Sequence, residues 1–532
     1  MVGPVIQVTL HSRFEAAFKS ALAYDNPVQD VRVVVEFTGA SGVERTEAFW
    51  DGENCWRVRF SPSQAGRWSW RTYCSPPDDS GLNGREGQFE CLEAASQDEW
   101  IANGPLRVSM DRRYLEYANG RPFFWLADTA WNGPLKSDEA DWEHYLADRR
   151  LKGFSAIQFV ATHWLGAAAD AEGRPAYTNP EKIRIEPAFF QRLDRRIDRI
   201  NDFHLVAAPV LAWAATWSLG SIHLNPGTSL ADDQIIVLIR YLISRYGAHQ
   251  VVWILAGDGS YEGAEAEHWR KIGRAALSGS SRLATIHPSA RLWVNREFNE
   301  ESWYSMNGYQ SGQWNDAESS RWINASRPQA EFALRPTIDL EPCYEDHRPL
   351  DAPEGRIDAR EVRRAAYWSL LAGPVAGVSY GAHGVWSWEN FPAVPLSHPD
   401  SGIARPWREA MTLPGSFSMS HLHSIVCAID WWRLNPCPEM LAAQPGDDDP
   451  LHFVAAACSP ERDLALLYAP AGGNIRIRAD YLAGRLEAIC FDPANGHRLW
   501  TQPFGRGACS LDCGADSDRL LLIRLEGTGR QL

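Results

Sequence analysis

The sequence predicts an α/β protein built on a (β/α)8 barrel, flanked by an N-terminal β-sandwich and a small C-terminal antiparallel β domain. Three observations support this fold class. From about residue 122, short apolar runs alternate with amphipathic helical patterns over about 300 residues, which is typical of βα units. The segments on either side alternate apolar and polar residues as strands do. No Gly-x-Gly-x-x-Gly turn follows the first run, which favours a closed barrel over an open doubly wound sheet.

The N-terminal residues 1–100 form the predicted β-sandwich. Strand-like alternation is clear in residues 31–37, 56–60 and 67–73, with Gly, Pro, Ser and Asp between these segments. In the connecting segment that follows, Asn119-Gly120 separates two strand-like runs, and this dipeptide predicts a tight hairpin.

Residues 101–423 form the predicted barrel, and eight apolar runs supply its strands. Between two of these runs, Ser229 and Asp232 have the spacing of a capping box ahead of a helix, and Gly247 stands at its expected end. Residues 424–532 become strand-like again and form the predicted C-terminal domain. The eight runs lie at residues 123–128, 154–161, 205–213, 251–258, 291–295, 303–310, 335–341 and 375–388.

Composition narrows the classes of partner. The chain carries 67 acidic and 52 basic side chains, for a formal net charge of -15, and no basic cluster reverses this balance locally, so nucleic acid is not an expected partner. No stretch of about 18 apolar residues occurs, so no membrane span is expected. The N-terminus lacks the pattern of a signal peptide, which predicts a cytoplasmic location, or a periplasmic or secreted one if a leader was trimmed. The sequence leaves the oligomeric state open, a homo-oligomer included.

The 10 cysteines are scattered, and their spacing predicts reduced structural thiols without a metal site or another cofactor. The 24 tryptophans are the unusual feature of the composition. Any single tryptophan is more often part of a core, but indole faces also stack against sugar rings, so this number favours a carbohydrate ligand.

In a (β/α)8 barrel the active site lies at the carboxyl ends of the strands, so the residues that end each run are the candidates for the site. Asp258 and Glu341 are the predicted catalytic pair. The predicted substrate-binding residues are Asp128, Trp131, His163, Trp164, Trp213, Tyr309, Gln310, Tyr344, His383, Trp386 and Trp388.

Asp258 ends the fourth run between Gly257 and Gly259, and Glu341 ends the seventh run. Cleavage of a glycosidic bond needs two such carboxyl groups, one to protonate the leaving oxygen and one to attack or stabilise the sugar carbon. Burial against aromatic side chains would raise the pKa of one carboxyl group and leave the other ionised. The sequence therefore predicts a two-carboxylate site at the barrel mouth.

Other interpretations of these residues stay open at this stage. Asp258 could instead cap a helix or form a structural ion pair, and Glu345 or Asp346 could act in place of Glu341, which is preferred because it ends the apolar run. His163 and His383 could join Asp128 around a metal ion, but isolated histidines more often hydrogen-bond to a substrate or a carboxylate. A serine hydrolase is not favoured, because no Gly-x-Ser-x-Gly follows a strand.

Five ordered motifs carry a resemblance to a known family: RPFFWLADTAW, LADRRLKGFSAIQ, VVWILAGDGSY, RPTIDLEPCYEDH and YGAHGVWSW. Together they resemble the apiosidase-like glycoside hydrolases, a family of (β/α)8 enzymes. The N-terminal segment, with FWDGENCWRVRFSPSQAGRWSWRT, resembles a β-sandwich domain of unknown function that precedes such barrels. The C-terminal LALLYAPAGGNIRI and CFDPANGHRLW are similar to a small β domain labelled collagen-binding.

The resemblance implies a retaining glycosidase with Asp258 as acid/base and Glu341 as nucleophile, acting on a plant- or microbe-derived oligosaccharide or glycoside. Related clans place an Asn-Glu pair after the fourth strand, whereas this chain has Gly257-Asp258, whose side chain is one methylene shorter. The alternative from another class is a non-catalytic carbohydrate-binding scaffold, in which the same aromatic mouth and both acids only bind hydroxyl groups.

Overall fold

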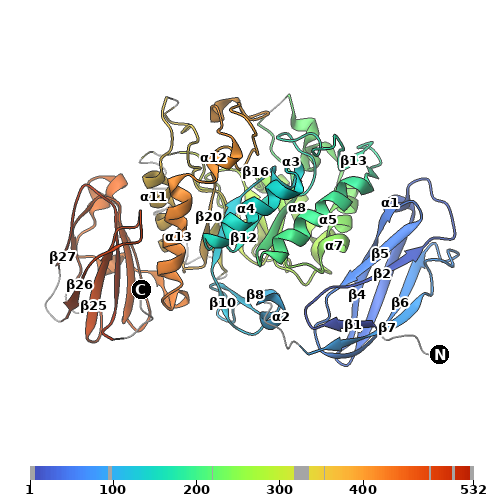
Figure 1. The fold of residues 1–532 in the computed structure, drawn as a ribbon, viewed down its shortest axis with the longest axis horizontal. Coiled ribbons are helices and arrows are strands. Elements are labelled where there is room, and N and C mark those ends of the chain that lie inside the picture. The colour runs from blue at the N-terminus through green and yellow to red at the C-terminus, as the bar shows by residue number, and fades with distance from the viewer. Residues whose placement is uncertain are drawn as a thin grey trace.

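The computed structural model describes residues 6–93, 99–217, 220–314, 316, 335–352, 354–478, 481–505 and 510–527. These residues form a row of three parts, with a β domain at each end and an α/β barrel between them (Figure 1). No helix among the described residues is long and apolar enough to cross a membrane.

The N-terminal domain is one seven-stranded sheet that folds over on itself. The long strand β4 pairs with β3 through its first half and with β5 through its last residues, so the sheet bends there. Phe14 of β2 stacks on Phe89 of β7 at 4.4 Å, although these strands stand at or next to opposite ends of the strand order. The order is β1 (Ile6–Thr9), β7 (Glu86–Leu92), β6 (Gly66–Ser75), β3 (Arg32–Gly39), β4 (Gly42–Gly52), β5 (Cys55–Phe60) and β2 (Phe14–Lys19).

Eight strands form the parallel barrel, which confirms the predicted fold class. Six of them are consecutive neighbours in one sheet, and β18 pairs in parallel with β19. The gap between β17 and β18 is bridged by Ser305, whose backbone N–H donates to the Ala284 carbonyl at 2.8 Å. The strands are β11 (Trp125–Thr129), β12 (Ala156–Val160), β15 (Val206–Trp213), β16 (Trp253–Gly259), β17 (Ala284–Pro288), β18 (Asn307–Tyr309), β19 (Thr337–Asp339) and β20 (Gly377–Tyr380).

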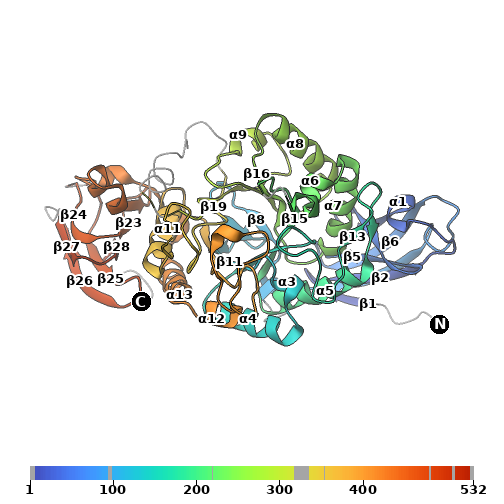
Figure 2. The same cartoon turned by 90° about the horizontal axis from the view of Figure 1, so that it is seen from above.

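Helices surround these strands, as the view from above shows (Figure 2). Helix α7 begins at Asp232 with Ala231 as its N-cap, so the predicted capping box is wrong, because Ser229 instead donates to the Asn225 carbonyl in the preceding turn. Gly247 is the C-cap, as predicted. The longer helices are α4 (Glu139–Leu151), α5 (Pro187–Asp202), α7 (Asp232–Tyr246), α8 (Gly263–Leu277), α11 (Ala359–Leu371) and α13 (Pro414–Val426).

The fifth barrel strand differs from the prediction. It lies at Ala284–Pro288, and the predicted run at 291–295 is a loop that leads into helix α9 (Asn295–Phe298). Arg291 has φ of 62°, in the left-handed region, and none of residues 291–294 is part of a strand. The apolar residues of this loop therefore pack without joining the sheet.

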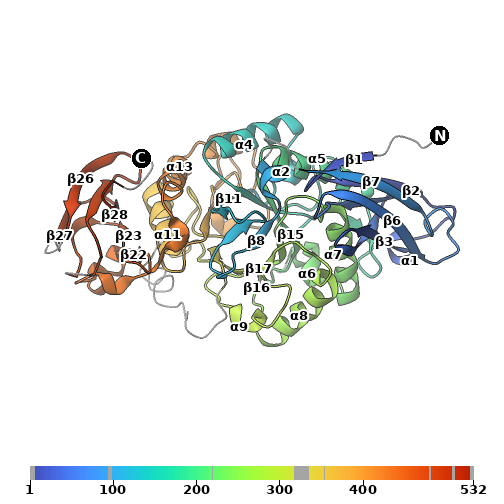
Figure 3. The same cartoon turned by 90° about the horizontal axis from the view of Figure 1, so that it is seen from below.

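A small antiparallel sheet of β8 (Leu106–Val108), β9 (Leu115–Tyr117) and β10 (Pro122–Phe123) lies beneath the barrel (Figure 3). The predicted hairpin at Asn119-Gly120 joins β9 to β10, and Gly120 takes the left-handed φ of 88° that such a turn requires.

The C-terminal domain packs against the barrel through helix α11. Arg363 of this helix forms a buried ion pair with Asp518, with Nε 2.8 Å from Oδ2. The predicted boundary after residue 423 lies within helix α13, which runs to Val426, and the predicted domain limits otherwise stay predictions. The main sheet is β21 (Asn435–Pro436), β22 (Ala455–Cys458), β23 (Leu464–Ala469), β28 (Arg519–Leu525), β25 (Leu486–Phe491) and β26 (Arg498–Phe504), and β24 (Gly472–Arg476) pairs with β27 (Ser510–Ala515).

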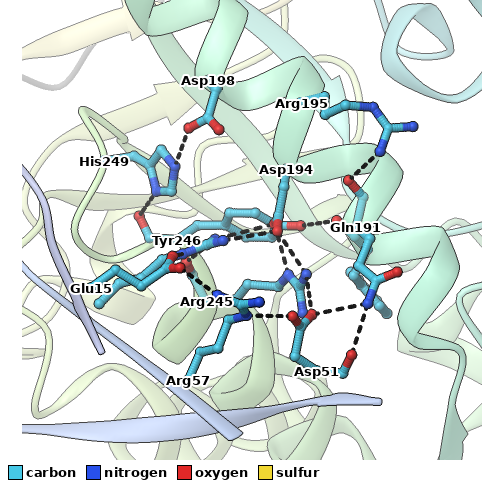
Figure 4. Close-up of polar contacts among 12 residues, drawn as sticks. Glu15, Asp51, Arg57, Gln191, Asp194, Arg195, Asp198, Arg245, Tyr246 and His249 are labelled. Carbon is cyan, nitrogen blue, oxygen red and sulfur yellow. Dashed lines mark hydrogen bonds and ion pairs between the residues drawn. The ribbon is translucent and has the colours of Figure 1, made fainter. Parts of the chain in front are cut away.

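A buried ionic network joins the N-terminal domain to the barrel (Figure 4). Arg245 of α7 is fully buried and contacts both Asp194 of α5, at 2.7 Å, and Asp51 of β4, at 2.8 Å. Arg59 of β5 reaches the same Asp194 carboxyl group at 2.9 Å. Burial alone would raise the pKa of Asp194, but the two guanidinium groups outweigh it and lower this pKa to about 2. The carboxylate of Asp194 therefore pairs with an arginine from each of the two domains where they meet.

Replacing Asp194 by Asn should destabilise the protein by about 3 kcal/mol at pH 7, because Arg59 and Arg245 are left buried without their partner. The native pKa lies below the unfolded one, so this stabilisation is present above about pH 4 and fades as the pH falls toward 2. Urea unfolding of the wild type and of Asp194→Asn between pH 3 and 7 measures this difference in the free energy of unfolding. Asp25→Asn is the matched control, because Asp25 also pairs with a barrel residue, Arg184, but is 82% exposed. An equal loss in both variants would contradict the prediction.

Candidate active site

Asp258 reaches the barrel mouth through an unusual backbone at the tip of β16. Its φ of 62° lies in the left-handed region, which is strained for a residue with a side chain. A Cβ atom at Gly257 would lie 2.5 Å from the ring of Trp213, and one at Gly259 would lie 2.5 Å from the ring of Tyr261. Both glycines are needed for this close aromatic packing, which holds the Asp258 turn in place.

Glu341 lies two residues beyond strand β19, and its side chain is 11% exposed. The Gln313 amide donates to Oε1 of Glu341 at 3.2 Å. The backbone N–H of Glu341 donates to Oδ1 of Asp339 at 3.3 Å, which fixes the turn from which the side chain leaves. The carboxylate is therefore oriented by neighbours while one edge stays open.

His287 ends strand β17 and is fully buried beside both acids. Its Nε2 lies 3.2 Å from Oε2 of Glu341, and its ring contacts Trp131 edge-to-face at 5.5 Å between centroids. Burial alone would lower the pKa of His287, but Glu341 and then Asp258 reverse this and raise the pKa above its usual value. The imidazole therefore holds a proton more readily than a histidine in water does.

Asp258 is half-buried, and its pKa is raised to about 6. Burial is the largest cause, and the negative charge of Glu341 is the second. The His287 charge and a hydrogen bond from Trp217 act in the opposite direction. In that bond, the indole Nε1–H of Trp217 donates to Oδ2 of Asp258 at 2.7 Å. Asp258 is therefore a carboxyl group that can hold a proton near neutral pH.

Both acids line one cavity of about 390 Å³. Its walls include six indole rings, which offer apolar faces against which a sugar can stack. Among the described residues, no Lys or Arg side chain lines it. The six tryptophans are Trp131, Trp164, Trp213, Trp217, Trp314 and Trp386.

Six of the predicted substrate-binding residues line this cavity together with the two predicted catalytic acids. Tyr344 is fixed there by Trp131, whose indole N–H donates to the phenolic oxygen at 3.0 Å. The six are Trp131, Trp164, Trp213, Gln310, Tyr344 and Trp386.

Asp128 does not reach the cavity, which corrects its prediction as a substrate-binding residue. It is fully buried, accepts a hydrogen bond from the Tyr145 hydroxyl at 2.5 Å and pairs with the buried guanidinium of Arg149. Its role is to hold helix α4 against strand β11.

Four further predicted residues also lie in the packing behind the cavity. His163 accepts a hydrogen bond at Nδ1 from the backbone N–H of Ala176 at 3.1 Å. His383 accepts at Nδ1 from the indole N–H of Trp386, also at 3.1 Å, and so positions a ring that does line the cavity. The last two pack against other rings, with 4.7 Å between the centroids of Tyr309 and Trp293 and 4.4 Å between those of Trp388 and Trp407.

The alternative acids have structural partners. Glu345 accepts hydrogen bonds from the Tyr380 hydroxyl at 2.6 Å and from the backbone N–H of Gly415 at 2.9 Å. Asp346 pairs with Arg405 at 2.8 Å. Helix α8 begins at Gly263 with Glu262 as its N-cap, so Asp258 caps no helix there.

Sequence reasoning missed several residues of the cavity. His287 was missed because the fifth strand was placed too late, although the short run ATIHP, which ends in His-Pro, carried the signal. His398 lies in a long loop after β20 and contacts three tryptophans, with 4.8 Å between its ring and that of Trp386. No periodic pattern marks such a loop. Other residues missed are Trp217, Ser289, Gln313, Trp314, His347 and Asp400.

Within the described parts of the chain, no group of three or more His, Cys, Asp or Glu side chains is arranged to hold a metal ion. His163 and His383, considered as ligands beside Asp128, are each engaged in hydrogen bonds within the protein.

Comparisons with known proteins identify two segments. The family described as "Apiosidase-like, catalytic domain" matches residues 109–433, and the family described as "Domain of unknown function (DUF5060)" matches residues 7–75. No curated protein matches the chain.

Solved structures share its fold. A glycoside hydrolase family 5 protein from Bacteroides vulgatus is 23% identical, with 81% of this chain and 94% of that chain covered and a TM-score of 0.70. A structure named "Glycoside hydrolase" is 22% identical, with 81% and 98% covered and a TM-score of 0.69. A second Bacteroides vulgatus structure is 18% identical and covers 98% of this chain and 99% of its own, with a TM-score of 0.69.

Replacing Trp217 by Phe should raise the pKa of Asp258 by about one unit, because the ionised carboxyl group loses a hydrogen bond. Carbon NMR of the labelled Asp258 carboxyl group, followed from pH 4 to 9, measures this pKa. Trp314→Phe is the matched control, because this indole lines the same cavity but stacks under Arg291 at 4.3 Å. If both variants gave the wild-type pKa, the Trp217 bond would not tune Asp258.

Proposed function

The chain belongs to the apiosidase-like family and is a glycosidase, and on that premise we propose that it cleaves a glycosidic bond of a plant- or microbe-derived oligosaccharide by a retaining two-carboxylate mechanism. The observation that carries the proposal is the pair Asp258 and Glu341. They stand at the carboxyl ends of two barrel strands and line one cavity, and the negative charge of Glu341 helps to raise the pKa of Asp258.

The pair has the division of roles that this reaction needs. Asp258, with a pKa of about 6, can arrive protonated and donate its proton to the leaving glycosidic oxygen. Glu341, held by Gln313 and beside the His287 imidazole, can attack the anomeric carbon to form a glycosyl ester. A retaining reaction places the two carboxyl groups about 5 to 5.5 Å apart.

The second half of the reaction follows from the same charges. Once Glu341 is esterified, it carries no negative charge, so one cause of the raised pKa of Asp258 disappears. Asp258, now deprotonated, accepts a proton from a water molecule, whose oxygen attacks the anomeric carbon and releases Glu341. Loss of the Glu341 charge thus makes Asp258 a stronger acid between its acid and base steps, which keeps it deprotonated until water arrives.

The lining of the cavity supports a saccharide without anionic groups as the substrate. Six indole faces suit the C–H surfaces of sugar rings, whereas the acids Asp258, Glu341 and Asp400 would repel a carboxylated sugar. No arginine or lysine of the described lining would compensate that repulsion.

Asp258→Asn and Glu341→Gln should each lower kcat/KM on an unactivated glycoside by about 10²- to 10⁴-fold or more, because each loses one of the two required groups. A panel of aryl glycosides and oligosaccharides, assayed with folding checked by thermal melting, measures the loss. Asp400→Asn is the control, because Asp400 lines the cavity without a role in the proposed chemistry.

The two roles can be separated by added azide. With a dinitrophenyl glycoside, Asp258→Gly should be rescued to give a glycosyl azide of retained configuration, and Glu341→Gly one of inverted configuration. Full activity in both acid variants would show that other residues carry out the reaction. A saccharide that binds to the wild type but is never cleaved would favour the alternative, a non-catalytic carbohydrate-binding scaffold.

The pH profile should report Asp258. Because the proton donor must be protonated, kcat/KM should fall as the pH rises above about 6. The His287 charge lowers the pKa of Asp258, so His287→Gln should move this limb to higher pH even where the rate itself drops. Initial rates between pH 4 and 9 measure the limb, and a limb that stayed fixed in His287→Gln would assign it to another group.

A further inference from the structure

The core of the C-terminal domain brings Cys437 and Cys458 into contact. Their Sγ atoms lie 2.7 Å apart, which is closer than two unbonded sulfur atoms normally approach. Cys437 follows strand β21 and Cys458 ends β22, and the antiparallel register pairs Asn435 with Cys458. The Cys437 N–H donates to the Ala456 carbonyl at 2.8 Å, so the two cysteines are diagonal neighbours on one face of the sheet.

Both thiols are buried, at 2% exposure for Cys437 and 8% for Cys458, and belong to the apolar core of this domain. The same core contains Cys490 of β25 and Cys513 of β27, which also lie within hydrogen-bonding reach of each other. Four of the nine described cysteines thus gather, as two pairs, in the core of the C-terminal domain. This grouping departs from the scattered, unpaired thiols that the sequence suggests.

We propose that Cys437 and Cys458 are joined by a disulfide when the chain folds in an oxidising compartment. Two Sγ–H bonds break and one S–S bond forms, and the two protons and two electrons pass to an oxidised thiol such as glutathione disulfide, which leaves as two glutathione molecules. The exchange occurs as the domain folds, because the native core shields both sulfur atoms from a second thiol.

The disulfide closes the segment that contacts the barrel. Residues 438–457 contain three short 3-10 helices before strand β22, and the Phe453 carbonyl accepts a hydrogen bond at 2.9 Å from the indole N–H of Trp368 in α11. Cross-linking the two ends of this segment restricts the unfolded chain and so favours the folded contact with α11. The bond would therefore stabilise the attachment of the C-terminal domain to the barrel.

Peptide mass measurement tests the proposal directly. The full chain is refolded from guanidinium in the presence of excess glutathione disulfide, the remaining free thiols are alkylated in guanidinium, and the protein is cut with trypsin. Both cysteines lie in one tryptic peptide, residues 434–462, between Arg433 and Arg462. The expected peptide carries no alkyl group and is lighter by two hydrogen atoms than the reduced form. Recovery of this peptide with two alkyl groups after refolding under these oxidising conditions would overturn the proposal.

Thermal melting supplies a second measurement. Reduction of the oxidised protein should lower Tm by about 5 °C, and Cys458→Ala should remove this dependence on reductant. Cys55→Ser is the matched control, because Cys55 is a half-buried thiol in the N-terminal domain, and its Tm should still fall on reduction. If Cys458→Ala does not fold, the mass of the wild-type peptide still shows whether the disulfide forms. A wild-type Tm that reductant leaves unchanged would show that no stabilising bond forms.

Discussion

The repulsion between Asp258 and Glu341 at one barrel mouth is the interaction on which the site depends. Two carboxyl groups that lie near each other in a shielded site raise each other's free energy when both are ionised, so one of them tends to keep a proton. Asp258 is that group, because burial and the Glu341 charge both raise its pKa. His287 limits the effect by placing an imidazole 3.2 Å from Glu341, which stabilises the negative charge on that side. The asymmetry between the two acids is therefore set by the strand ends and the side chains beside them.

The aromatic packing serves this asymmetry. Trp213 occupies the space that a side chain at Gly257 would need, and Trp217 covers Asp258 while donating to it. Rings near the acids exclude water, which strengthens every charge interaction in the cavity. The charged pairs behind the barrel strands have a different role. Asp128 and Arg149 are wholly buried, and their ion pair fixes helix α4 to the sheet. The charge of Asp128 therefore stabilises the fold and does not act in the cavity.

The barrel, most of its strand ends and the position of both acids at the mouth could be predicted from the sequence, because a buried parallel strand is an apolar run that ends at the mouth. The same rule wrongly placed the side chain of Asp128 in the barrel mouth. It lies at a strand end but points outward to Arg149, and alternate residues of a strand face opposite sides. An apolar run shows where a strand is, yet for a strand buried on both faces it does not show which side chains face the interior.

The prediction of the fifth strand was wrong for a related reason. Residues 291–295 look apolar, but the left-handed turn at Arg291 keeps them out of the sheet. The true strand at Ala284–Pro288 is short, and its apolar run stops before His287. His287 was lost with it, although it is the group that couples to both acids. Loop residues such as His398 and Trp217 follow no period at all, because their positions are set by tertiary contacts.

The Gly257-Asp258-Gly259 turn shows how a shorter acid can occupy this position. Aspartate reaches one methylene less far than glutamate, so its backbone must stand closer to the cavity for the carboxyl group to reach the same point. The left-handed φ of 62° turns Asp258 out of the strand, and the adjacent glycines let Trp213 and Tyr261 pack directly on the backbone. The Ser289 hydroxyl donates to the Asp258 carbonyl at 2.8 Å and holds the turn from the next strand. Backbone conformation and packing thus supply the reach that the side chain lacks.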